Sequence, residues 1–264
     1  MRILRFRKTP QDPPTWGWLA NGEIGLLDGS PFEDFRRLEA KISLDKAQLL
    51  SPVAPGKIIC VGHNYAAHAA EHEVEVPQIP LLFLKPPSTV IGPGGSIFLP
   101  PQSQNVEHEA ELAVVIGAHG RWLTKEQAKD VILGYTAALD ITARDLQRQD
   151  DQWTRAKGFD TFCPLGPWIE TDLDPADALI TCTVNGNLRQ MASTRDMIFP
   201  VWEIVAFVSS VMSLEPGDVI LTGTPAGVGP LKPGDEVTVE IEGIGVLSIA
   251  VKNDPNVERT QENR

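Results

Sequence analysis

The alternation of apolar and polar positions predicts a chain built mainly from short β-strands. Asn-Gly pairs at 21–22 and 185–186 each separate two alternating runs, which is the pattern of a two-residue β-hairpin. Further short runs predict strands at 57–62, 81–84, 106–116, 135–141, 219–222, 236–241 and 246–251. Many strands punctuated by Gly and Pro favour a β-rich α+β fold over a regular βαβ array.

Helical periodicity is confined to short segments. We expect helices near residues 32–39, 65–73, 142–149 and 200–214, and another from Thr124 to about residue 133. Thr124 and Gln127 have the spacing of a capping box at the start of that last helix.

Prolines and a glycine around residues 52–56 predict a boundary in the chain. We therefore divide the sequence into a small N-terminal β-rich subdomain (1–54), a larger domain (55–252) that carries the candidate chemistry, and a polar C-terminal tail (253–264).

Composition excludes some classes of protein. The 264 residues carry a formal net charge of −12 and contain no dense Lys/Arg block, so a nucleic-acid partner is not expected. Three cysteines without a C-x-x-C pair do not suggest a disulfide framework. The chain has no signal-type segment at its start and no apolar run of the ~18 residues that a membrane span needs, so we expect a cytoplasmic protein without a membrane partner.

Two acidic residues stand inside an apolar strand pattern at Glu109 and Glu111. Strand side chains alternate, so both carboxylates point to one face and His108 points to the other. Burial of two like charges is costly unless a cation or a proton lies between them. Spacing alone leaves open a metal site or a hydrated strand end. An all-oxygen ligand set favours Mg²⁺, Mn²⁺ or Ca²⁺ over zinc.

Further candidate groups follow other apolar segments. Asp140 ends one of them and is either a third acidic ligand or, like Thr142, a helix N-cap. His68 and Glu71 share a helix face, either as a general base with its orienting carboxylate or as ordinary surface residues. The other histidines have no spacing that demands a metal. A lone lysine such as Lys157 is more often a solvated side chain.

A glycine-rich segment at 223–229 follows a predicted strand. It lacks the Gly-Lys-Ser/Thr ending of a phosphate-binding loop. Its backbone amides are suited to receive a carboxylate, but a tight connection has the same pattern.

Taken in order, several motifs resemble the fumarylacetoacetate hydrolase family. The motifs are Val-Gly-His-Asn-Tyr-Ala-Ala-His at 61–68, Phe-Leu-Lys-Pro at 83–86, His-Glu-Ala-Glu-Leu at 108–112, Leu-Asp-Ile-Thr-Ala-Arg-Asp at 139–145, Lys-Gly-Phe-Asp-Thr at 157–161, Val-Asn-Gly at 184–186 and Gly-Thr-Pro-Ala-Gly-Val-Gly at 223–229. They cover about residues 55–252, and the ordered set is specific for the family but not for a substrate. His63, Gly158, Arg195 and Pro200 depart from the residues common at those positions in the family. These departures affect the pocket rim and the choice of substrate.

The resemblance implies a mixed β-sandwich roll of the fumarylacetoacetate hydrolase C-terminal type, with the small N-terminal subdomain attached. It implies one Mg²⁺ or Mn²⁺ per subunit, held by Glu109, Glu111 and Asp140, and a homodimer. It also implies a water-activating dyad of His68 and Glu71 on a lid, with Lys157 beside the metal. The substrate-contacting positions that it implies are Arg144, Gln147 and Thr224.

These residues lead to a working hypothesis about function. We expect a divalent-metal-dependent hydrolase that cleaves a C–C bond in an acylpyruvate or a fumarylacetoacetate-like β-diketo acid, through an enolate stabilised by the metal. His68 would deprotonate water, and Lys157 would stabilise the resulting oxyanion. The alternatives are an oxaloacetate-type decarboxylase, a 2-hydroxyhepta-2,4-diene-1,7-dioate isomerase or tautomerase, and a non-catalytic protein that binds a metal or metabolite.

Overall fold

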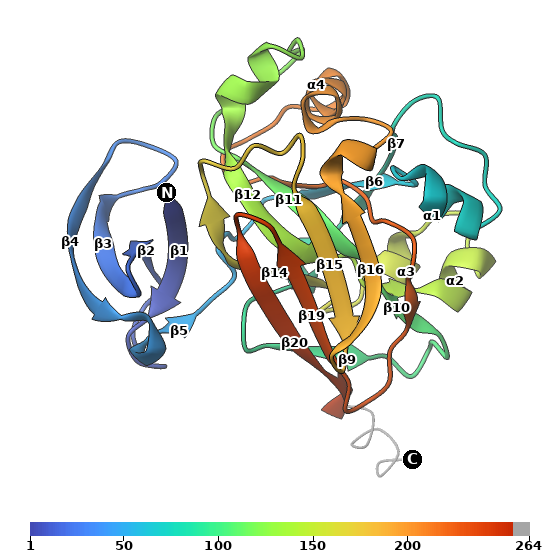
Figure 1. Cartoon of the computed structure of the whole chain (residues 1–264), viewed down its shortest axis with the longest axis horizontal. Coiled ribbons are helices and arrows are strands. Elements are labelled where there is room, and N and C mark those ends of the chain that lie inside the picture. The colour runs from blue at the N-terminus through green and yellow to red at the C-terminus, as the bar shows by residue number, and fades with distance from the viewer. Residues whose placement is uncertain (256–264) are drawn as a thin grey trace.

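A computed structural model describes residues 1–255, and within them three sheets dominate the fold (Figure 1). The strands are β1 (Arg2–Arg7), β2 (Thr15–Ala20), β3 (Glu23–Gly29), β4 (Phe35–Ser43), β5 (Gln48–Leu49), β6 (Ile58–Gly62), β7 (Leu81–Lys85), β8 (Val90–Ile91), β9 (Ser96–Leu99), β10 (Val106–His108), β11 (Ala110–Ile116), β12 (Ile132–Leu139), β13 (Thr142–Ala143), β14 (Cys163–Glu170), β15 (Leu179–Val184), β16 (Asn187–Ser193), β17 (Val219–Leu221), β18 (Gly229–Pro230), β19 (Glu236–Ile241) and β20 (Gly245–Asn253). The helices are α1 (Ala66–Glu71), α2 (Arg144–Gln149), α3 (Thr154–Lys157) and α4 (Val201–Val211), with 3₁₀ turns η1 (Leu44–Lys46), η2 (Pro87–Thr89), η3 (Gln127–Val131) and η4 (Thr194–Asp196).

The largest sheet runs in the order β4-β3-β2-β1-β14-β12-β11-β17-β6-β7. A second sheet, β16-β15-β19-β20-β9, packs against β11 and β12, and the main apolar core fills the space between the two. This arrangement confirms the expected β-rich α+β sandwich roll. Both Asn-Gly hairpins form as predicted, between β2 and β3 and between β15 and β16.

The N-terminal strands are joined to the rest of the molecule through β1. Arg2 and Ile3 of β1 pair with Glu170 and Ile169 of β14, and β2, β3 and β4 continue the sheet outward. Figure 1 shows these strands, in blue, at one end of the molecule. The boundary after residue 54 stays a prediction, and most of the predicted tail lies outside the described residues.

Alternation along β11 explains why acidic residues are tolerated in an apolar strand. Leu112, Val114 and Ile116 belong to the main core, whereas Ala113 and Val115 belong to a second cluster on the opposite face of the sheet. Glu111 shares the parity of the latter pair and therefore points away from the sandwich interior.

Two predicted helices are wrong. Residues around 32–39 instead contribute to β4, which pairs with β3, so tertiary pairing overrides the weak local pattern. The helix expected from Thr124 is only the turn η3, because Ile132 already pairs with Ile116 in the β11–β12 ladder. The capping interaction itself does form: the Thr124 amide donates to Gln127 Oε1 at 3.0 Å, and the Gln127 amide donates to Thr124 Oγ1 at 3.3 Å.

The single strand expected over 106–116 is divided at Glu109. Residues of β10 pair with β13 and β18, whereas β11 pairs with β12 and β17. The carbonyl of Glu109 accepts a hydrogen bond from the amide of Asp140 at 2.8 Å, which brings these two acidic residues together. None of the described helices has both the length and the apolar composition needed to cross a bilayer.

Candidate active site

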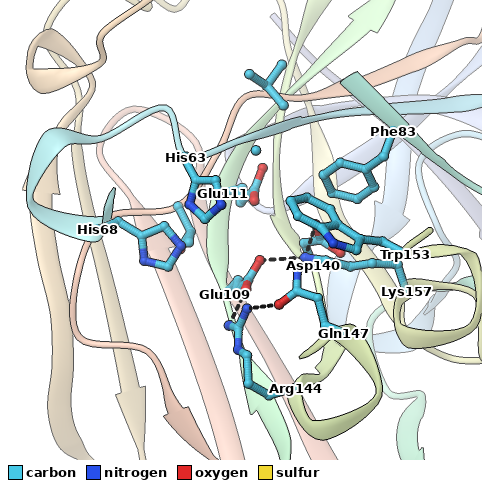
Figure 2. A pocket seen from close by; sticks show the side chains of 13 residues that line it. His63, His68, Phe83, Glu109, Glu111, Asp140, Arg144, Gln147, Trp153 and Lys157 are labelled. Atoms are coloured by element: carbon cyan, nitrogen blue, oxygen red, sulfur yellow. Dashed lines mark hydrogen bonds and ion pairs between the residues drawn. The ribbon is translucent and has the colours of Figure 1, made fainter. Parts of the chain in front are cut away.

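Several chain segments meet around one small cavity beside the ends of β6, β11, β12 and β17 (Figure 2). His68 comes from α1, Arg144 and Gln147 from α2, and Lys157 from α3. Figure 2 shows the histidines on one side of the cavity and Trp153 with Lys157 on the other. The cavity also borders Glu109, Glu111, Asp140 and Thr224, so nearly all the predicted site residues line one space.

The three predicted acidic ligands converge. Glu109, Glu111 and Asp140 are buried, and each offers a carboxylate oxygen within 4.8 Å of the others. Burial raises the pKa of Glu111 well above its ordinary value, and the nearby charges of Asp140 and Glu109 add to the shift. Asp140 is not a helix N-cap, because α2 is preceded by Ala143 and has no side-chain cap.

Buried cations hold two of these carboxylates. Nζ of Lys157 lies 2.8 Å from Glu109 Oε2 and 2.8 Å from Asp140 Oδ2. Nζ of Lys85 donates to Asp140 Oδ1 at 2.6 Å and to the carbonyl of Ile141 at 3.1 Å. Burial alone would raise the pKa of Glu109, but the charges of Lys157 and Arg144 lower it well below its ordinary value.

The donor set fits a divalent cation. Among the described residues, the buried cations Lys85, Lys157 and Arg144 pair with Asp140, Glu107 and Glu109, and Glu111 has no cationic partner, so a bound divalent cation would offset the raised pKa of Glu111 and keep its carboxylate ionised. Within residues 1–255, the hydrogen-bond donor to the Glu111 carboxylate is the amide of Gly223, at 2.6 Å from Oε2. An all-oxygen cluster with unused lone pairs is suited to Mg²⁺ or Mn²⁺.

The predicted dyad forms on α1. Nδ1 of His68 lies 3.2 Å from Oε2 of Glu71, and Glu71 is itself held by the amide of Gly227 at 3.1 Å from Oε1. Burial lowers the pKa of His68, and this effect exceeds the opposing effects of Glu109 and Glu71. A neutral imidazole with Nδ1–H directed at Glu71 leaves Nε2 able to accept a proton.

The predicted substrate contacts have different surroundings. Arg144 donates to Glu107 Oε2 at 2.7 Å, to Gln147 Oε1 at 2.6 Å and to Glu109 Oε1, so its guanidinium is held at the cavity wall by three acceptors. The Thr224 hydroxyl donates to the carbonyl of Ala110 at 2.9 Å and accepts from Gln190 at 2.8 Å. These bonds use three of the five N–H donors of Arg144 and only the amide oxygen of Gln147, so both side chains keep donors for a ligand, whereas the single hydroxyl hydrogen of Thr224 is engaged.

Several residues at or near the site were not assigned a role from the sequence. Lys85 belongs to a quoted motif, and its signal was a charged residue in an apolar strand directly before two prolines. Gln190 is fully buried and carried no such signal. It links His108 Nδ1 (3.0 Å), the Ala110 amide (3.1 Å) and Thr224, so it ties β16 to the strand that carries the acidic residues.

Comparison with known proteins shows what this chain is similar to. The family description "Fumarylacetoacetate (FAA) hydrolase C-terminal" matches residues 57–252, and the description "Rv2993c-like, N-terminal" matches residues 1–52. A protein named oxaloacetate tautomerase FAHD2B, mitochondrial, from Bos taurus is 47% identical over 283 residues, covering 94% of this chain and 90% of its own.

Solved structures agree with the sequence matches. The structure of a 2-hydroxyhepta-2,4-diene-1,7-dioate isomerase from Mycobacterium marinum has a TM-score of 0.88 and 42% identity, over 97% of this chain and 99% of that one. A maleylpyruvate hydrolase from Sphingobium sp. SYK-6, in complex with manganese(II) and pyruvate, has a TM-score of 0.78 and 33% identity, over 96% and 99% of the two chains. With the family description matched over most of its length, the chain belongs to the fumarylacetoacetate hydrolase family.

Proposed function

We propose that this protein is a divalent-cation-dependent enzyme that moves a proton within small 2-oxo diacids, interconverting keto and enol forms of oxaloacetate or a close analogue. The observation that carries the proposal is the convergence of Glu109, Glu111 and Asp140 beside a buried, neutral histidine. The similarity to a tautomerase over 94% of the chain favours proton transfer over the C–C hydrolysis expected from the sequence.

The expected cation is Mg²⁺ or Mn²⁺, held by those three carboxylates. When bound, it supplies Lewis-acid stabilisation of negative charge on the oxygens of a 2-oxo acid. The solved relative that contains manganese(II) and pyruvate supports this assignment.

His68 is the proposed base. It takes a proton from the carbon next to the 2-oxo group, and a proton returns to the oxygen of that group, so the conversion needs no co-substrate. Glu71 holds the imidazole in the tautomer that leaves Nε2 available and stabilises the imidazolium that forms. Lys157 adds positive charge close to the reacting oxygen, and Arg144 with Gln147 is placed to orient a carboxylate of the substrate.

A second candidate is the hydrolysis of an acylpyruvate. The same dyad is suited to activating water, and the similarity to a protein named maleylpyruvate hydrolase supports this candidate. In that case the hydroxide attacks the distal carbonyl, the C–C bond breaks, and the products are a carboxylic acid and a 2-oxo acid.

The homodimer and the cytoplasmic location stay predictions.

The test is a substrate panel measured with Mg²⁺ and with Mn²⁺. Enol absorbance follows tautomerisation of oxaloacetate, a coupled pyruvate assay follows its decarboxylation, and loss of the diketo chromophore follows acylpyruvate hydrolysis. We expect the first reaction to be the fastest relative to its uncatalysed rate. Faster cleavage of an acylpyruvate would favour the second candidate, and pyruvate release from oxaloacetate would favour decarboxylation.

A variant pair checks the role of the base. His68→Ala should lose proton transfer by about 10²–10⁴-fold. The matched control is His119→Ala, because His119 Nδ1 also lies 3.2 Å from a carboxylate, that of Glu215, but at an exposed position away from the cavity. Equal activity of the two variants would overturn the base assignment.

A further inference from the structure

A second histidine, His72, lies next to the His68–Glu71 dyad on the same face of α1. His68, Glu71 and His72 stand at positions i, i+3 and i+4, where α1 ends, so their side chains are neighbours. Each offers one ligand atom, and these atoms all lie within 4.8 Å of one another. The rings of His68 and His72 are 4.6 Å apart between centroids and nearly perpendicular.

Two imidazole nitrogens in this region have no partner. Within residues 1–255, Nε2 of His72 and Nδ1 of His63 are shielded from solvent and form no hydrogen bond. An unpaired polar atom in such a place costs free energy, so its retention needs an explanation. The ring of His63 lies 5.7 Å from that of His68 and 6.2 Å from that of His72. Three imidazoles therefore gather beside one carboxylate.

We propose that His68, Glu71 and His72 form a second cation site, separate from the acidic cluster and selective for a transition-metal ion such as Zn²⁺. Imidazole nitrogen is a preferred ligand of Zn²⁺, Cu²⁺ and Ni²⁺, whereas Mg²⁺ prefers oxygen ligands. The sequence His-x-x-Glu-His on a helix is also a pattern that places two histidines around one metal.

The separations suit a tetrahedral ion after small side-chain movements. Ligand atoms about 2.0–2.1 Å from zinc lie about 3.3 Å from one another. Nδ1 of His68 and Oε2 of Glu71 are already 3.2 Å apart. Nε2 of His72 then has to approach by rotation of one side chain, and His63 is the nearest further imidazole.

Occupancy of this site has a consequence for catalysis, and this consequence rests on the proposed function. A metal at Nδ1 of His68 forces the remaining ring proton onto Nε2. The imidazole then has no lone pair with which to take a proton from the substrate, and Glu71 is no longer available to stabilise the charged ring. We infer that Zn²⁺ switches the enzyme off without displacing the cation that supports the reaction.

Direct binding is measured first, with Zn²⁺ as the probe and Mg²⁺ at saturation so that the acidic cluster is filled. Competition with a chromophoric chelator gives the affinity, and the visible absorption of Co²⁺ reports nitrogen ligands and a low coordination number. We expect one Zn²⁺ per chain, and His72→Ala and His72→Gln should each weaken binding by at least about tenfold. The control His119→Ala should bind like the parent chain. The result that overturns the site is equal Zn²⁺ affinity in the parent and in both well-folded His72 variants.

Inhibition is measured separately. Zn²⁺ should inhibit the parent enzyme with a midpoint that does not move as Mg²⁺ is raised, and the midpoint should shift upward by at least about tenfold in the His72 variants, each compared with its own zinc-free activity. Relief of inhibition in proportion to added Mg²⁺ would instead place Zn²⁺ at the acidic cluster. If no 2-oxo acid is turned over, the proposed function fails, but the binding measurement still decides whether this site exists.

Discussion

The ammonium of Lys157 lies 2.8 Å from Oε2 of Glu109, and both side chains are buried. It lies equally close to Asp140, so it bridges two of the three carboxylates that are expected to hold the cation. The lysine and a divalent cation therefore serve the same electrostatic purpose, because each offsets repulsion among buried acidic groups.

Removal of that ammonium should destabilise the protein. Lys157→Met keeps the unbranched apolar part of the side chain but removes the ammonium, so Glu109 and Asp140 lose one of their counterions, and breaking a buried ion pair in this way costs about 3–5 kcal/mol. Urea unfolding measures the loss, and added Mg²⁺ should restore part of it. The control Lys125→Met removes an exposed pair with Glu203 and should change stability by about 1 kcal/mol or less. Equal losses in the two variants would contradict this account.

Cation binding should depend on Glu111. A cation that binds only the folded state stabilises it, so Mn²⁺ at about 100 times its Kd should add about 2.7 kcal/mol to the free energy of unfolding. Glu111→Gln removes one carboxylate charge from the cluster and should abolish most of this gain, whereas Glu240→Gln, at an exposed position on β19, should preserve it. Thermal unfolding with and without Mn²⁺ measures both. A gain that survives in Glu111→Gln would place the cation elsewhere.

Activity should fall in acid. Burial lowers the pKa of His68 below 6.5, so the imidazole is neutral at pH 7 and becomes charged only as the pH falls through this lowered value. The free energy of unfolding should also fall in acid, because the imidazole of the unfolded chain binds a proton near pH 6.5, whereas that of the folded chain binds it only at lower pH. A profile of kcat/KM over about pH 5 to 8 should show this acid limb. Its persistence in His68→Gln would assign the limb to another group.

Gln190 should contribute to the stability of the structure around the site. Its amide joins the carbonyl of Pro225 at 2.7 Å and the Thr224 hydroxyl to the amide of Ala110, so Gln190→Leu leaves buried polar groups without partners. We expect a loss of about 1–3 kcal/mol in the free energy of unfolding. The exposed Gln127→Leu loses only one capping bond and serves as the control. Unchanged stability of Gln190→Leu would show that water replaces these contacts.

Local sequence patterns predicted the individual hairpins and strands better than the pairing between strands. The hairpins and the strand carrying Glu111 follow from turn residues and alternation, which depend on near neighbours. The two wrong helices lie where pairing with the preceding strand outweighs a weak helical pattern: β4 forms a hairpin with β3, and Ile132 pairs with Ile116 of β11. The acidic cluster was predictable because the resemblance named its members. Gln190 was not, because a single polar residue in a strand carries no sign of which distant groups it joins.

The contacts that build the site join segments that are far apart in the chain. Lys157 and Glu109 are separated by 48 positions, and Gly223 and Glu111 by 112. Long loops must close before such contacts form, which is characteristic of slow-folding β-proteins. Glu109 and Glu111 are neighbours in the sequence, but Asp140 and Gly223 join them only through the pairing of β11 with β12 and β17. We therefore expect Mn²⁺ binding during refolding to report the pairing of these three strands.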